Sequence, residues 1–390
     1  MRRLLIISVG LAALMAGVLG AWYAVRQERE FRRLIVAGNS ALAQDETYGA
    51  IEAFSGALAL RDDSMLAHLR RGDAYRRRGE LPAALRDLRR AVALDPSAPA
   101  PVELSGDVNV AMGRYARAAE DYKAFTLLDD RSPRVLYKLG LAYYRNQQID
   151  EAVVALRNAI ALDTRLAEAH YLLGVCLRER SEIAEARQAL NTALEISPTF
   201  AAVREELVDL YEATGRRREA IEQLEALAAL EPTRPERLVN VGLAYASWGR
   251  TDAAVLTLAR AADRYPDEQS VRTALGRVWL DEAERGDAVA LEKALGALRP
   301  IASPATASAE TLTLFGRALL LSGELRTAER TLVEAATRPP VDPSVFRHLA
   351  DTAERLGHVP VARDALHRYV ALVGESEIDR QTAEQLRRLR

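Results

Sequence analysis

Residues 65–98 read MLAHLRRGDAYRRRGELPAALRDLRRAVALDPSA, and this stretch decides the fold. Counted from Met65, it carries Gly72 at position eight, Tyr75 at eleven, Ala84 at twenty and Pro96 at thirty-two. Residues of the same kinds recur along the chain at multiples of 34, in four separate phases. Self-similarity at a fixed period indicates a chain of stacked repeats rather than one conventional core.

The recurrence extends from residue 31 to residue 376. Repeats begin at residues 31, 65, 99, 133, 167, 201, 235, 269, 309 and 343. Position eight is glycine in eight of these ten repeats, with Val208 and Ala350 as exceptions, and position twenty is alanine in all but one, where Leu291 stands. Only a small side chain lets two helix axes approach to the short end of the range of about 8–10 Å. We therefore expect a pair of touching helices in each repeat.

These positions resemble those of the tetratricopeptide repeat (TPR) family, whose unit is a helix–turn–helix of about 34 residues. The resemblance covers about residues 31–376 and implies an all-α superhelical solenoid of about ten repeats. Proline at position thirty-two cannot continue a helix, so it marks the end of the second helix of a repeat. One helix pair cannot cover its own apolar stripe, so each repeat is expected to pack on the next.

One interval departs from the period, because Gly276 and Gly316 stand farther apart than one repeat. We interpret the excess as three extra residues near Gly286 and Asp287 and three more within residues 299–308. The joint there is expected to be the weakest, which divides the repeats into residues 31–305 (repeats one to eight) and 306–376 (repeats nine and ten). The polar segment 377–390 is expected to form a helix that caps the open end of the stack.

The N-terminal segment, residues 1–30, is predicted to be a membrane anchor. Leu4 to Val25 contains no charged residue and would span about 33 Å as a helix, enough for a bilayer core of roughly 30 Å. The alternative is a cleaved signal peptide, whose apolar stretch is normally shorter. Arg2 and Arg3 favour a cytoplasmic N-terminus. The sequence thus predicts a single-pass protein, typical of a bacterial inner membrane, with its main part outside the cytoplasm.

Composition excludes several classes of protein. Hydrophobic residues make up 49% and charged residues 28%, so a packed protein is expected, and a net charge of −2 argues against nucleic acid as a partner. A single cysteine, Cys176, excludes an intrachain disulfide and is expected to be a buried, inert thiol. The minimal motifs of metalloproteases, hydrolases and P-loop enzymes are absent. We expect no catalytic residue, metal or cofactor; the alternative is an enzyme site in the concave face that uses His348 or His367.

In TPR proteins, positions two, five, six, nine, twelve and thirteen of the first helices line a concave groove. The resemblance implies a partner-binding groove lined mainly by cations and tyrosines: Arg70, Arg77, Arg134, Tyr137, Lys138, Leu141, Tyr144, Arg145, Tyr171 and Arg178. Arginine binds carboxylates in a bidentate manner and tyrosine offers rigid contact area, so the set favours a protein or peptide partner with acidic residues. The alternative is that these side chains are solvated or pair with neighbouring repeats, since arginine is the default cation of this chain.

Taken together, these features predict a membrane-anchored TPR scaffold or adaptor that holds a protein or peptide, in bacterial envelope assembly. The alternative is a cytoplasm-facing regulator of a membrane enzyme. Both predictions depend on the resemblance and on the groove, and neither rests on a catalytic constellation.

Overall fold

The computed structural model describes residues 2–374 and 377–389, and for residues 2–13 and 16 it describes the backbone alone. This part of the chain contains α-helices and no strand, which confirms the all-α prediction. The helices are α1 (Arg2–Ala43), α2 (Thr47–Leu60), α3 (Met65–Arg77), α4 (Leu81–Leu94), α5 (Pro99–Ala111), α6 (Tyr115–Leu128), α7 (Pro133–Arg145), α8 (Ile149–Leu162), α9 (Ala167–Glu179), α10 (Ile183–Ile196), α11 (Ala201–Ala213), α12 (Arg217–Leu230), α13 (Pro235–Ser247), α14 (Thr251–Arg264), α15 (Gln269–Glu284), α16 (Ala288–Leu298), α17 (Ala309–Ser322), α18 (Leu325–Ala335), α19 (Ser344–Leu356), α20 (Val359–Val373) and α21 (Arg380–Arg388).

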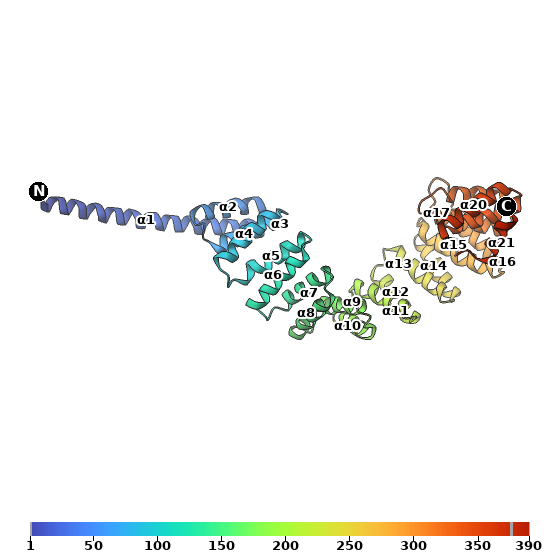
Figure 1. Cartoon of the computed structure of the whole chain (residues 1–390), viewed down its shortest axis with the longest axis horizontal. Coiled ribbons are helices and arrows are strands. Elements are labelled where there is room, and N and C mark those ends of the chain that lie inside the picture. Colours follow the sequence, from blue (N-terminus) through green and yellow to red (C-terminus); the bar gives the residue numbers. More distant parts are fainter. Residues whose placement is uncertain (1, 375–376, 390) are drawn as a thin grey trace. The chain divides into compact units, whose positions relative to one another are not determined.

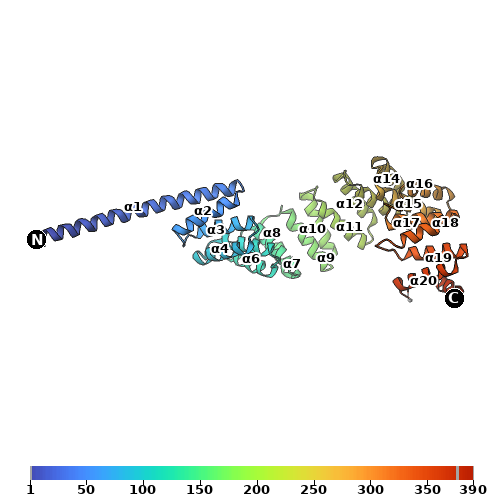
Figure 2. The same ribbon diagram turned by 90° about the horizontal axis from the view of Figure 1, so that it is seen from above.

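The chain divides into two compact parts, which we call the first half (Met1–Val203) and the second half (Arg204–Arg390). In each half, successive helices pack as pairs, for example α3 with α4 and α17 with α18 (Figures 1 and 2). The first helices of the repeats begin at the predicted residues, from Met65 to Ala309, and α19 begins one residue later than predicted. The predicted boundary between residues 305 and 306 lies inside the second half and stays a prediction.

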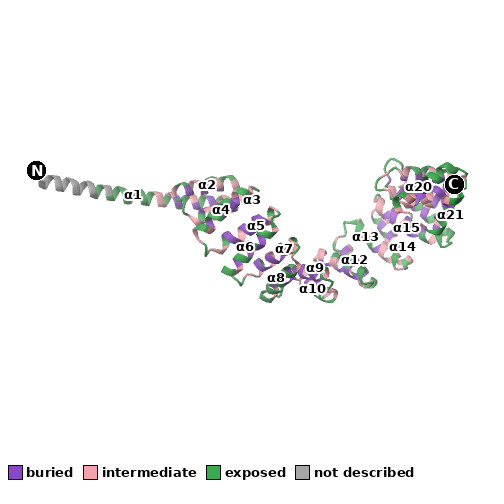
Figure 3. Ribbon diagram, in the orientation of Figure 1, coloured by how far each residue is buried: buried purple, intermediate pink, exposed green. Residues whose placement is uncertain are grey.

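The small residues at position eight lie where the two helices of a repeat touch. A Cβ atom added to Gly72 would come within 3.0 Å of Leu88, and one added to Gly140 would come within 2.7 Å of Leu156. Both leucines are fully buried, and Figure 3 shows buried residues concentrated between the paired helices. The close approach that the sequence predicts is therefore confirmed.

Ala186→Leu is expected to lower the free energy of unfolding by about 1–3 kcal/mol, because it overpacks this contact. Ala186 is fully buried on α10, and its carbonyl oxygen lies 3.2 Å from the place that a Cβ on Gly174 would occupy. Thermal unfolding followed by circular dichroism measures the loss. Ala161→Leu, at an exposed position of α8, is the control. An unchanged melting temperature for Ala186→Leu would contradict the helix register.

The extra residues of the eighth repeat lie elsewhere than predicted. A Cβ on Gly276 would meet Leu298, which is six positions farther along the chain than the equivalent partner in other repeats, such as Leu88 for Gly72. All of the additional residues therefore precede Leu298, and the fully buried Ala294 stands at position twenty. The assignments of Leu291 to that position and of three extra residues to 299–308 are wrong.

Instead, the added residues lie on both sides of the turn between α15 and α16, although α16, with 11 residues, is shorter than the 14-residue α4 because it also ends earlier. α15 has 16 residues where α3 has 13, and α16 begins correspondingly earlier relative to Ala294. The turn between α15 and α16 keeps the length of the turn between α3 and α4. Residues added to a helix satisfy their own backbone hydrogen bonds, whereas residues added to a loop do not, which explains this placement.

The predicted membrane anchor is not supported. In the part of the chain that the structure describes, no helix combines the length and the apolar character needed to cross a bilayer. α1 is long, but it carries charged residues from Arg26 onward, and its Phe31 and Ile35 pack in the first helix pair. The prediction of a single-pass membrane protein is therefore wrong. The two predicted orientations, with the main part outside or inside the cytoplasm, depended on that prediction and are no longer supported. Residues 4–13 and 16 of the predicted span lie outside the residues whose side chains are described.

Near the C-terminus, α21 lies within the segment predicted to cap the stack. Asp379 accepts a hydrogen bond from the backbone N–H of Thr382 at 2.7 Å and so caps the start of the helix. The Gln385 amide donates to Asp351 at 2.9 Å and to Glu354 at 2.7 Å, both on α19. Leu389 is buried in the apolar cluster of α19 and α20.

Candidate functional site

A hollow of about 430 Å³ lies on the first helices of three successive repeats in the first half. Its walls come from α3, α5 and α7, and its lining residues are Leu69, Arg70, Asp73, Arg76, Ala100, Glu103, Leu104, Asp107, Arg134 and Lys138. These residues combine an apolar floor with charged side chains of both signs. We call this the α3–α5–α7 hollow.

Two carboxylates of α5 bind the cations of α7 in this hollow. Glu103 pairs with Arg134 at 2.6 Å and with Lys138 at 2.7 Å, and Lys138 also lies 2.7 Å from Asp107. Partial burial alone would raise the pKa of Glu103, but the hydrogen bonds from Lys138 and Arg134 outweigh it and hold that pKa below its ordinary value. Glu103 is therefore a fixed negative charge at neutral pH.

Asp107 accepts a hydrogen bond from the buried Tyr122 side chain. The Tyr122 hydroxyl donates to Asp107 at 2.6 Å, and its ring fills the space beside Gly106, where a Cβ would come within 2.5 Å of it. Burial and the neighbouring carboxylate raise the pKa of Tyr122 above its usual range, so the phenol keeps its proton. Lys138 and Asp107 consequently form a rigid part of the hollow.

The charges of α3 are arranged differently. Asp73 pairs with Arg76 at 2.7 Å and with Arg77 at 3.1 Å, and Arg77 also donates to the carbonyl of Leu42 at 3.2 Å. Arg77 thus belongs to the packing between repeats and is outside the lining of the hollow. Arg70 lines the hollow, is exposed, and makes no ion pair with any residue that the structure describes.

The predicted groove residues therefore separate into groups. Arg70, Arg134 and Lys138 come together in the α3–α5–α7 hollow. Further along the first helices, the Tyr144 hydroxyl donates to Glu179 at 3.0 Å, and the Tyr171 ring lies 5.2 Å from that of Phe200. The remaining predicted residues do not line this hollow and are exposed or half-buried: Tyr137, Leu141, Arg145 and Arg178.

Sequence reasoning missed the acidic half of the hollow. Glu103 and Asp107 stand at positions five and nine of the third repeat, which are groove positions, but the predicted set names only cations, tyrosines and one leucine. The signal was present in the spacing: Lys138 follows these carboxylates by 35 and 31 residues, about one repeat. Side chains one repeat apart on first helices lie side by side.

The second half has a smaller polar hollow of about 280 Å³ on α15, α17 and α19, which His348 lines together with Asp281 and Asp342. Burial, aided by Arg317 and Arg347, lowers the pKa of His348 to about 4. His367 is exposed on α20 and does not line this hollow, so the two histidines of the enzyme alternative do not converge.

Two other histidines and the cysteine are held by hydrogen bonds or by burial. His68 bonds to Asp87 at 3.0 Å, and His170 to the carbonyl of Thr164 at 3.1 Å. Cys176 is buried, as predicted, and burial raises the pKa of its thiol to about 12. Among the described residues there is no group of three or more His, Cys, Asp and Glu side chains that could hold a metal ion.

Comparison with known families identifies the class of protein. Models of the tetratricopeptide repeat match residues 35–99, 104–164, 137–199 and 177–241, which together make up more than half of the chain. The chain therefore belongs to the tetratricopeptide repeat family and is a protein-interaction scaffold of that type. No curated protein matches it.

Several solved structures are similar to parts of the chain. The crystal structure of MamA is 29% identical, covers 42% of this chain and 95% of its own, and has a TM-score of 0.41. YrrB, described as a TPR protein with an unusual peptide-binding site, is 23% identical over 48% of this chain and 97% of its own, with a TM-score of 0.43. The C-terminal part of a TPR protein from Cytophaga hutchinsonii is 16% identical over 62% of this chain and 99% of its own, with a TM-score of 0.54, and shares the fold.

Proposed function

We propose that the first half of the chain binds an extended segment of a protein partner in the α3–α5–α7 hollow, and that acidic residues of this segment contact Arg70. The observation that carries the proposal is the position of Arg70, an exposed guanidinium without an ionic partner among the described residues, beside the apolar floor formed by Leu69 and Leu104. An arginine in this setting binds a carboxylate in a bidentate manner.

The charge balance of the hollow supports an acidic ligand. Four lining cations, Arg70, Arg76, Arg134 and Lys138, face three lining carboxylates, so the hollow has an excess of one positive charge. The Arg134 side chain is 73% exposed, whereas its partner Glu103 is only 18% exposed and also pairs with Lys138. A ligand carboxylate can therefore reach Arg134 from solvent, while Lys138 and Asp107 stay in place.

Arg70→Glu is the variant that tests this function. Peptides are selected from a random library on the wild-type protein, and their dissociation constants are then measured on both proteins. We expect selected peptides to contain Asp or Glu, and we expect the charge reversal to weaken them about tenfold or more, since a hydrogen bond to a charged group contributes about 1.5–3 kcal/mol.

Arg90→Glu is the matched control, because Arg90 is an exposed arginine of the same repeat that lies on α4, away from the hollow. It makes the same change in net charge and is expected to leave the dissociation constants unchanged. Equal weakening by both variants, or selection of peptides without acidic residues, would contradict the proposal.

A further inference from the structure

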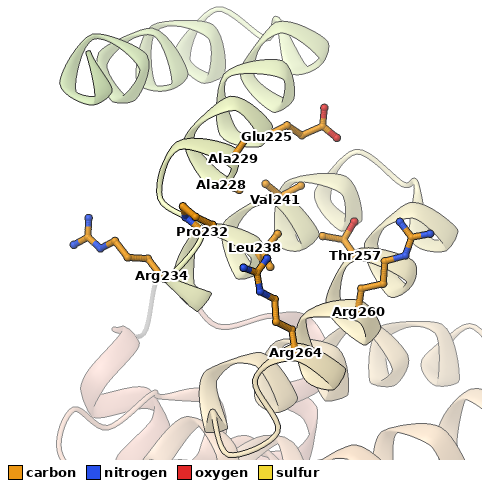
Figure 4. Close-up of a pocket in the computed structure, with 10 residues that line it drawn as sticks. All are labelled: Glu225, Ala228, Ala229, Pro232, Arg234, Leu238, Val241, Thr257, Arg260 and Arg264. Carbon is orange, nitrogen blue, oxygen red and sulfur yellow. The ribbon is translucent and has the colours of Figure 1, made fainter. Parts of the chain in front are cut away.

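A second hollow, of about 400 Å³, lies in the second half, mainly on the second helices of two successive repeats. It is bordered by α12 and α14 and by the start of α13 (Figure 4). Its lining residues are Glu225, Ala228, Ala229, Pro232, Arg234, Leu238, Val241, Thr257, Arg260 and Arg264. We call this the α12–α14 hollow.

The floor of this hollow is apolar. Val241 is buried, Leu238 is half-buried, and both stand on α13, while Ala228 and Ala229 line it from α12. Small side chains on α12 leave room above the floor. An apolar surface of this kind gains free energy when an apolar side chain covers it, at about 25 cal/mol per Å².

One wall carries cations that the described residues do not neutralise. Arg260 and Arg264 are exposed, stand one turn apart on α14, and make no ion pair within the described part of the chain. Figure 4 shows both rising from α14, whereas Arg234 points away from the hollow. Arg234 also has its own partner, Glu231, at 3.1 Å. Like charges four residues apart on a helix repel each other, and a bound anion relieves that repulsion.

The one carboxylate at the rim is already engaged. Glu225 accepts a hydrogen bond from the Tyr245 hydroxyl at 2.7 Å and makes no ion pair with either arginine within the described part of the chain. The α14 residues that line the hollow therefore contribute two positive charges and no negative charge. The hollow as a whole combines a cationic wall with an apolar floor.

We propose that the α12–α14 hollow is a second docking site, for an extended peptide segment in which acidic and apolar residues alternate. Residues i and i+2 of an extended chain lie on one face about 7 Å apart. Residues four apart on α14 are separated by about 6 Å along its axis. Two acidic side chains of the segment thus match Arg260 and Arg264, and the apolar residues between them face Leu238 and Val241.

This site is separate from the α3–α5–α7 hollow and goes beyond the proposed function. The two hollows share no residue and lie in different halves of the chain. A scaffold with both sites binds two segments at once.

The probe for this site is a fluorescein-labelled peptide of sequence Leu-Glu-Leu-Glu-Leu, with Leu-Gln-Leu-Gln-Leu as its uncharged match. Binding is measured by fluorescence polarisation on the full chain with Arg70→Glu, so that the α3–α5–α7 hollow does not contribute. We expect the glutamate peptide to bind and the glutamine peptide to bind about tenfold more weakly or worse.

Two variants remove the two parts of the site separately. Arg260→Glu with Arg264→Glu reverses the cationic wall, and Ala229→Trp fills the hollow while leaving the arginines intact. Each is expected to weaken the glutamate peptide about tenfold or more. Ala229 is exposed, so the larger side chain does not disturb the core, and circular dichroism checks the helical content.

Arg326→Glu with Arg330→Glu is the matched control. These arginines are also exposed and four residues apart on a second helix, α18, but they do not line the α12–α14 hollow. We expect the control to leave the affinity within about twofold. The proposal is overturned if the glutamate peptide does not bind, if the control weakens it as much as the Arg260/Arg264 variant, or if Ala229→Trp has no effect.

Discussion

Asp87→Ala is expected to lower the free energy of unfolding by about 3–5 kcal/mol, the largest loss that we predict for one substitution. The buried Asp87 carboxylate on α4 binds the Arg71 guanidinium through two hydrogen bonds, at 2.6 and 2.8 Å, and the His68 ring at 3.0 Å. Arg71 also donates to Ser55 on α2 at 3.1 Å, so the network joins the first and second repeats. Alanine would leave the Arg71 guanidinium, only 22% exposed, without its counter-charge.

The measurement is urea unfolding followed by circular dichroism. Glu185→Ala is the control, since it breaks an ion pair of similar length, Arg157–Glu185 at 2.9 Å, in which both side chains are more than half exposed. The control is expected to cost less than about 1 kcal/mol. If the two substitutions had equal effects, the Asp87 network would not join the repeats in the way described.

The second large effect is a pH dependence that originates at His348. Burial and two neighbouring guanidinium groups lower the pKa of this histidine to about 4, whereas its ordinary value in an unfolded chain is about 6.5. Between these two pH values the unfolded state binds more protons than the folded state, so stability is lost as the pH falls. From pH 7 to pH 4.5 this group alone accounts for a loss of about 2–3 kcal/mol.

His348→Gln removes the titrating group and is expected to remove that part of the loss. Asp281 and Asp351, whose pKa values burial raises, change stability in the opposite direction, but they are present in both proteins and cancel in the difference. Urea unfolding of the wild type and of His348→Gln, each at pH 7 and pH 4.5, gives the four free energies of unfolding that the comparison needs. His367→Gln, at an exposed position, is expected to behave as the wild type does. Parallel losses in wild type and His348→Gln would refute this assignment.

The sequence predicts the helix pairs well because the close contact between two helices depends on very few positions. Gly72, Gly140 and Ala186 lie at contacts where a larger side chain does not fit, so small residues there recur with the period of the structure. In the eighth repeat, the positions of the added residues were predicted wrongly. Spacing alone shows that residues were added but not where they lie, and the contact between Gly276 and Leu298 places them all before Leu298.

The candidate site was predictable only in part, because its charges pair across repeats. Lys138 on α7 finds Glu103 on α5, which is 35 residues earlier. The alternative that these cations pair with neighbouring repeats describes Lys138 and Arg134, but the sequence analysis did not name their partners Glu103 and Asp107. The membrane prediction failed for a different reason, since it rested on a stretch without charges, while α1 continues past that stretch into the first helix pair.

The residues added on both sides of the turn between α15 and α16 have a consequence for protein engineering. Three residues added to the end of α15 and three added to the start of α16 extend the hairpin by about 4.5 Å, while the contacts of Gly276 and of the following repeat keep their geometry. The turn between two such helices is therefore a tolerant insertion point. Equal numbers of residues added on both sides of any other turn are expected to extend that helix pair outward without shifting the neighbouring repeats. Such an extension offers a way to graft new binding elements onto this scaffold.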